Sequence, residues 1–142
     1  MNDPFDLQRF VDAQKPLFEE VRAELRRGHK AGHWMWFVFP QLKGLGRSSM
    51  AEKFGISSRA EAEAYLAHPV LGPRLIECTE LINRVEGKSA EEIFGSIDAM
   101  KLRSSLTLFA QVASEKTVFQ NALLKYFDGR PDQLTLDRLL LP

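Results

Sequence analysis

The segment from Leu71 to Val85 carries the helical signal that most constrains the fold of this chain. Its apolar residues recur at steps of four, three, four and three positions, at Leu71, Leu75, Cys78, Ile82 and Val85. Because an α-helix turns once in about 3.6 residues, this spacing places all five on one face. Gly87 then follows as a typical helix stop. A chain with such a face must bury it against other helices or a sheet.

The other segments also favour helices. Residues 4–27 are predicted to form one kinked helix or two abutting helices, with Asp3 as N-cap before Pro4. A helix follows Ser58 in a capping box with Glu61, and a short turn follows Ser89 in a capping box with Glu92. The other predicted helices are the seam at 71–85, 97–113, 118–127 with Thr117 as its cap, and 131–140. The loop GLGRSSM separates two of them. We therefore predict an all-α fold: a single compact domain over residues 1–142 with seven or eight short helices and little or no sheet.

The run WMWFVF at 34–39 is compatible with either a buried strand or a buried helix. Pro40 ends it in both cases. No other segment offers a partner with strict alternation, and an isolated strand leaves its backbone groups unpaired. We therefore favour a helix for this run.

Composition excludes several classes of function. The 142 residues hold 19 Lys+Arg and 19 Asp+Glu, so there is no basic excess for nucleic acid, although RRGHK at 26–30 forms a local basic patch. The single cysteine excludes an internal disulfide. The start of the chain lacks an apolar signal core, and no apolar run approaches the roughly 20 residues that span a bilayer. We expect a cytoplasmic protein that does not enter membranes and needs no cofactor.

The helix predicted over 97–113 has polar residues on its apolar side. Asp98, Lys101 and Ser105 fall within the arc formed by its large apolar residues. An acid and a base three residues apart can meet on a helix, and neither charge is buried cheaply alone. The pair is therefore either a buried ion pair that fixes helix packing or part of a cleft. In a cleft, Asp98 would accept a proton or bind a hydroxyl, and Lys101 would bind an anion such as phosphate.

Aromatic residues and a polar loop surround Pro40. Trp34 and Trp36, next to His33, are either core residues or a platform for a base or planar ring. The loop that follows is either a surface turn or an anion site whose donors would be Gln41, Lys43, Arg47 and Ser48 around glycines. Its spacing does not match a phosphate-binding P-loop. The pair His29 and His33 lacks the further ligands of a zinc site, so we predict no bound metal.

Three runs support a family resemblance: HWMWFVFPQLKGLGRSS, YLAHPVLGPRL and IFGSIDAMKLRSSLTLF. Together they strongly resemble the bacterial domain-of-unknown-function family 1810, which implies a small, largely helical, cytoplasmic protein. Some members carry the label calpastatin-like, which a chain with a globular core pattern does not fit. A fainter similarity, based on Asp98, Lys101 and the run VFQNALLKYF, is to the NADAR family. That similarity implies NAD or ADP-ribose chemistry.

These observations lead to one main hypothesis and one alternative for function. The main hypothesis is a polar cleft that binds an anionic small molecule, phosphorylated or nucleotide-like. If the protein is an enzyme, the predicted reaction is hydrolysis of an N-glycosidic bond. In that case Asp98 would position water and Lys101 would hold an anion. The alternative is a non-catalytic module that docks a partner peptide in an apolar groove. Binding of nucleic acid is disfavoured, and the sequence leaves the oligomeric state open.

Overall fold

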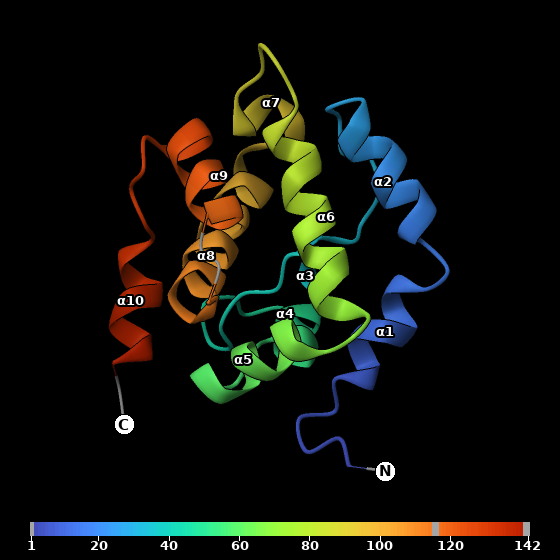
Figure 1. Ribbon diagram of the computed structural model, residues 1–142, viewed down its shortest axis with the longest axis vertical. Coiled ribbons are helices and arrows are strands. Elements are labelled where there is room, and N and C mark those ends of the chain that lie inside the picture. The colour runs from blue at the N-terminus through green and yellow to red at the C-terminus, as the bar shows by residue number, and fades with distance from the viewer. Residues whose placement is uncertain (1, 115–116, 141–142) are drawn as a thin grey trace.

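The computed structural model describes residues 2–114 and 117–140, and within them the chain forms ten helices and no sheet (Figure 1). The all-α prediction is confirmed, with more helices than the seven or eight expected. The 4–27 segment forms two helices, and the predicted loop at 44–50 runs into an additional one. The helices are α1 (Gln8–Gln14), α2 (Phe18–Arg26), α3 (Met35–Val38), α4 (Ser49–Phe54), α5 (Arg59–Ala67), α6 (Leu71–Asn83), α7 (Ala90–Phe94), α8 (Ser96–Val112), α9 (Thr117–Phe127) and α10 (Gln133–Leu139).

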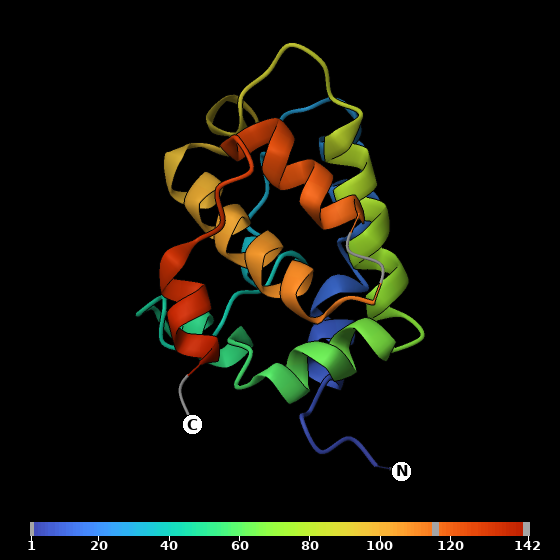
Figure 2. The same cartoon turned by 60° about the vertical axis from the view of Figure 1, so that its left-hand side comes forward.

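Helix α8 lies at the centre of one half of the molecule, where it packs against α5, α7, α9 and α10 (Figure 2). Leu102, Leu106 and Phe109 of α8 are buried in the core. The predicted seam helix α6 packs against α2, α5 and α9, and Figure 1 shows it between α2 and α9. Along the described part of the chain, no helix combines the length and apolarity needed to cross a bilayer.

The run at 34–39 forms the short helix α3, as predicted, and then leaves it at Phe39. Beyond it lies one isolated parallel bridge between Leu42 and Ile56, the only β pairing among the residues described. Ile56 donates its N–H to Gln41 over 2.9 Å and accepts from the N–H of Lys43 over 2.8 Å. This bridge fixes the chain that follows Pro40 against the segment between α4 and α5.

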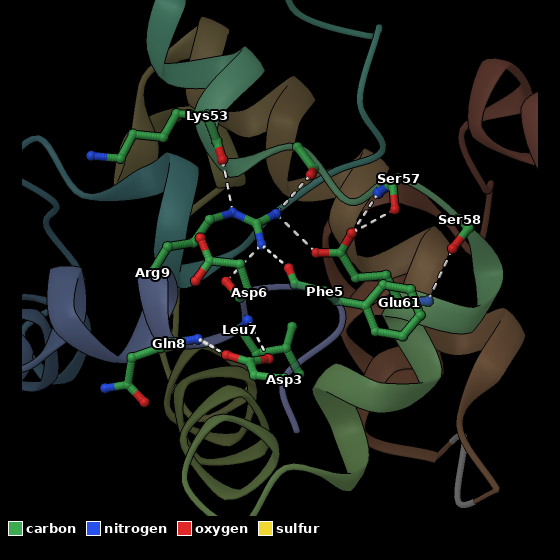
Figure 3. Close-up of polar contacts among 11 residues, drawn as sticks. Asp3, Phe5, Asp6, Leu7, Gln8, Arg9, Lys53, Ser57, Ser58 and Glu61 are labelled. Carbon is green, nitrogen blue, oxygen red and sulfur yellow. Dashed lines mark hydrogen bonds and ion pairs between the residues drawn. The ribbon is translucent and has the colours of Figure 1, made fainter. Parts of the chain in front are cut away.

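The two predicted capping boxes have different outcomes. Ser89 and Glu92 form both hydrogen bonds of the box at the start of α7. Ser58 caps α5 by accepting from the N–H of Glu61 over 3.1 Å, but the Glu61 carboxylate does not return the bond. It instead accepts from the N–H and hydroxyl of Ser57 and from Arg9 (Figure 3). The prediction of a box at Ser58 was wrong because a cation from a distant segment offers Glu61 a stronger partner.

The Arg9 guanidinium joins the N-terminal segment to the α4–α5 region. It donates to the carbonyls of Phe5 at 2.6 Å, Asp6 at 2.9 Å, Lys53 at 2.8 Å and Gly55 at 3.0 Å, besides its ion pair with Glu61 (Figure 3). Five planar N–H donors suit this clustering of carbonyls. Because the guanidinium is fully engaged by the protein itself, the cluster is a structural tie and offers nothing to a ligand.

The first helix begins later than predicted. Asp3 does act as a cap, but its carboxylate accepts from the N–H groups of Leu7 at 2.8 Å and Gln8 at 3.0 Å. The helix starts at Gln8 rather than at Pro4, and Asp6 between them adopts a positive φ of 51°. That left-handed residue turns the chain, so the residues before it cannot continue the helix.

Candidate functional site

Asp98 lies in the first turn of α8 between two lysines. Its Oδ2 is 2.8 Å from Nζ of Lys30, and its Oδ1 is 3.7 Å from Nζ of Lys101. The exposed fractions of these side chains are 20% for Asp98, 8% for Lys30 and 22% for Lys101. Asp98 and Lys101 therefore meet as predicted, but the shorter ion pair is with Lys30, a residue far away in the sequence. The two lysines balance a carboxylate that would be costly to bury alone.

The two tryptophans have opposite surroundings. Trp34 is 1% exposed, and its indole N–H donates to Glu24 over 2.9 Å. Trp36 is half-buried, and its Nε1 is shielded from solvent but donates to no atom of the described protein. Nζ of Lys101 lies 4.9 Å from the Trp36 ring centroid, within the range of a cation–π contact. Of the two indoles, Trp36 is thus the one with a free donor beside the lysine pair.

Two sizeable cavities and one narrow one meet around these side chains. The first, of about 350 Å³, is lined by Lys30, His33, Met35, Trp36, Phe94, Gly95, Ser96, Ile97 and Asp98. The second, of about 270 Å³, is lined by Gln41, Leu45, Gly46, Ile97, Met100, Lys101, Arg103, Ser104, Asp132 and Leu134. The narrow one, of about 10 Å³, shares Trp36 with the first cavity, and Gln41 and Lys101 with the second. We call the three together the α8 groove.

Glu24 stabilises the backbone turn beside the groove. Its Oε1 accepts from the backbone N–H groups of Ala31 at 2.7 Å and Gly32 at 2.9 Å, in addition to the Trp34 indole. Burial on its own would raise the pKa of Glu24, but these three donors outweigh it and hold the pKa below the usual 4.5. The buried carboxylate thereby fixes the turn that carries Lys30 and His33 to the groove.

The structure brings together five of the ten residues predicted for a site. His33, Trp36 and Asp98 line the first cavity, whereas Gln41 and Lys101 line the second and the narrow one. The other five line none of the three: Trp34 lies in the core, Ser105 is 1% exposed, and the side chains of Lys43, Arg47 and Ser48 are exposed elsewhere. The Ser105 hydroxyl is buried without a hydrogen-bond partner in the described part of the chain.

The glycine-containing loop has a structural explanation of its own. Ser48 accepts from the N–H of Ala51 over 3.1 Å and so caps α4. Gly44 has a φ of 95°, and a Cβ placed there would come within 2.4 Å of the Arg138 guanidinium. A side chain at Gly44 would push the end of the Arg138 side chain aside and would be strained at this positive φ, which explains this glycine without an anion. Lys43 points to a different cavity, which it shares with Arg138.

Sequence reasoning missed the residues that reach the groove from distant segments. Lys30 belongs to the basic run RRGHK, which the sequence indicates only as a patch for nucleic acid. Asp132 and Leu134, at the start of α10, line the second cavity because α10 packs beside α8. Asp132 accepts from the hydroxyls of Ser104 at 3.1 Å and Thr135 at 2.6 Å, which holds α10 in this place. Periodicity within one helix carries no signal for such contacts.

The chemistry of the groove is that of anion binding. It offers two ammonium groups, an indole N–H, an amide side chain and a histidine, with one carboxylate already paired to both lysines. The residues described contain no group of three or more His, Cys, Asp or Glu side chains that could hold a metal ion.

Comparison with known proteins places the chain in a family. A family model described as "Protein of unknown function (DUF1810)" matches residues 4–139. The chain belongs to this family. The resemblance predicted from the three sequence runs is thus confirmed, whereas the fainter similarity to the NADAR family stays a prediction. No curated protein matches the chain.

A solved structure agrees with the fold of this DUF1810 member. The crystal structure of the conserved hypothetical protein Rv1873 from Mycobacterium tuberculosis is 56% identical, and the match covers 99% of this chain and 100% of that one. The TM-score is 0.97. The description of that protein names no ligand or activity, so the function of the groove has to be argued from its own residues.

Proposed function

We propose that this DUF1810 protein binds a small anionic molecule with a planar ring, of the nucleotide or ADP-ribose type, in the α8 groove. The observation that carries the proposal is the arrangement around Asp98: Lys30 and Lys101 flank it, and Trp36, whose buried indole N–H has no partner among the described residues, lines the first cavity beside them. Ammonium groups bind phosphate, and an indole both contacts a ring and donates a hydrogen bond. The first cavity, about 350 Å³, is within the usual range for a small ligand.

The start of α8 adds to the attraction for an anion. Its N-cap is Gly95, which has no side chain to cap the first-turn amides, and Gly95, Ser96 and Ile97 line the first cavity. The partial positive charge at a helix N-terminus favours a negative group there. The Asp98 carboxylate does not cancel this attraction, because one carboxylate is shared by two lysines. A bound phosphate would compete with Asp98 for their ammonium groups.

The test is a thermal-shift titration with AMP, ADP, NAD and ADP-ribose, followed by NMR of the two indole N–H signals. A ligand at about 100 times its Kd stabilises the folded state by about 2.7 kcal/mol, which is several degrees in Tm. The Trp36 signal should move and the Trp34 signal, held by Glu24, should not. Lys101→Gln should weaken binding, and the matched variant Lys43→Gln, in a different cavity, should not. Absence of any stabilisation at millimolar ligand would refute the proposal.

A second proposal, hydrolysis of an N-glycosidic bond, depends on the first. Asp98 would accept a proton from water as the water oxygen bonds to the anomeric carbon. The ring nitrogen would leave with the electrons of the broken C–N bond and take up a proton from solvent, to which Asp98 then releases its own. Lys101 would hold the phosphate during this step. The position of Asp98 in the wall of the first cavity supports this role. Chromatography would detect the released base, and Asp98→Asn should abolish its release.

A further inference from the structure

We infer that the ligand of the α8 groove is an amphiphilic anion, whose charged group occupies the first cavity and whose short apolar chain or ring occupies the second. The assignment of the charged group to the first cavity rests on the proposed function above. The assignment of the apolar group is independent of it, because it follows from the lining of the second cavity. The ligand is therefore an anion of the proposed class that also carries an apolar chain or ring of a few carbons, which occupies the second cavity.

The second cavity gathers exposed apolar side chains. The described residues include six large apolar side chains that are exposed, and three of them line this one cavity: Ile97 at 71%, Met100 at 73% and Leu134 at 65%. Leu45, which is half-buried, adds a fourth apolar wall. Single exposed apolar residues need no explanation, but a cluster around a hollow indicates a surface that is covered in function.

The apolar and the charged halves are adjacent on α8. Ile97 lines both cavities, and Asp98 and Met100 follow it within one turn of the helix. One turn corresponds to a rise of about 5.4 Å. A single small molecule therefore reaches from the lysine pair to Met100, and an anion alone would leave the second cavity unfilled.

The charges at the second cavity favour an anionic occupant over a cationic one. Lys101 and Arg103 line it. The Arg103 guanidinium donates to the carbonyls of Arg130 and Pro131, and no carboxylate in the described part of the chain forms an ion pair with it. The one acid here is Asp132, and hydroxyl donors already occupy its carboxylate. The occupant is thus apolar with a negative end rather than a positive one.

The size of the cavity favours a free molecule over a lipid in a bilayer. Its volume of about 270 Å³ accommodates a short chain or one ring. Leu134 and Asp132, at the start of α10, line it together with residues of α8, so the site is a hollow between two helices rather than a flat face. We therefore assign the groove to a soluble monomeric amphiphile.

The test is a titration with methyl, butyl and octyl phosphate below the micelle-forming concentration, with butanol and inorganic phosphate as separate arms. Each buried methylene should tighten binding roughly four-fold, so the Kd should fall at least tenfold from methyl to butyl phosphate. The Trp36 indole signal reports occupancy of the charged end. Butanol alone and inorganic phosphate alone should bind more weakly than butyl phosphate.

Variants locate the apolar end. Met100→Gln and Leu134→Gln should each raise the Kd for octyl phosphate several-fold and leave the Kd for inorganic phosphate unchanged. The control is Leu124→Gln, which replaces a similarly exposed leucine on α9 and should change neither Kd. Equal Kd values for methyl and octyl phosphate, equal effects of all three variants, or binding only to phosphatidylglycerol vesicles would overturn the inference. If nucleotides shift Trp36 but chain length has no effect, this inference fails alone. If neither class of ligand shifts it, the proposed function fails as well.

Discussion

At the scale of single residues, the indoles of Trp34 and Trp36 show how two positions in one short run acquire different roles. Trp34 faces the core, where Glu24 accepts its N–H over 2.9 Å. Trp36, two residues further on, lines the groove, and its shielded N–H has no partner among the described residues. A buried indole N–H without an acceptor costs free energy, which Trp34 avoids through Glu24 and Trp36 does not.

Glu24 gives the first prediction, a pH dependence of stability. Its folded-state pKa lies below 4.5, so its contribution is fully present above that pH and is lost as the pH falls through the lowered pKa. Glu24→Gln keeps the shape but weakens three charge-assisted hydrogen bonds, at a cost of about 1–2 kcal/mol at neutral pH. Urea denaturation at a series of pH values measures the free energy of unfolding of both proteins.

The difference between wild type and Glu24→Gln should shrink below pH 4.5, where the wild-type carboxylate takes up its proton. The exposed residue Glu80 on the neighbouring helix α6 supplies the control, since Glu80→Gln should leave the pH profile unchanged. A difference that stays constant from pH 3 to pH 7 would show that folding does not lower the pKa of Glu24 and would contradict the prediction.

At the scale of elements, short helices are placed by polar contacts from other segments. Asp132 caps α10 by accepting from the N–H of Thr135 over 3.1 Å, and it also accepts from Ser104 on α8. Its own N–H donates to the Thr107 hydroxyl over 2.8 Å. One residue thus starts α10 and fixes it to α8. The seven residues of α10 would be marginal as an isolated helix, so this attachment decides whether it forms.

The second prediction follows from this attachment. Asp132→Ala removes the cap and the bond from Ser104, and loss of an N-cap costs about 0.5–2 kcal/mol. Hydrogen exchange measured by mass spectrometry should show faster exchange in 133–139 with little change in α6. The control is Asp137→Ala, because exposed Asp137 accepts, among the residues described, only from the Gln133 side chain of the same helix. Uniformly faster exchange in all helices would contradict a local role for Asp132.

At the scale of the whole molecule, the sequence predicts contacts within one segment better than contacts between distant segments. The seam at 71–85 predicted α6, and the polar residues on one face of α8 predicted that Asp98 and Lys101 meet. Lys30 and Leu134 were missed, because their places at the groove depend on how distant elements pack. The same limit applies to Glu61, whose partner Arg9 is 52 residues away. Periodicity and capping rules act over a few residues and cannot supply such contacts.

Cys78 tests the cooperativity of the whole fold. It is fully buried on α6, which packs against α2, α5 and α9, and burial raises the pKa of its thiol to about 12. Both access and thiolate formation therefore require α6 to separate from its neighbours. We expect native-state labelling with a thiol-specific reagent at pH 8 to be limited by global unfolding. The free energy of opening obtained from the labelling rate should then match the free energy of unfolding from urea denaturation within about 1 kcal/mol.

Glu80→Cys in a Cys78→Ala background is the exposed control and should react at the rate of a free thiol. A markedly smaller free energy for Cys78 would mean that α6 opens locally while α8 and its groove stay folded.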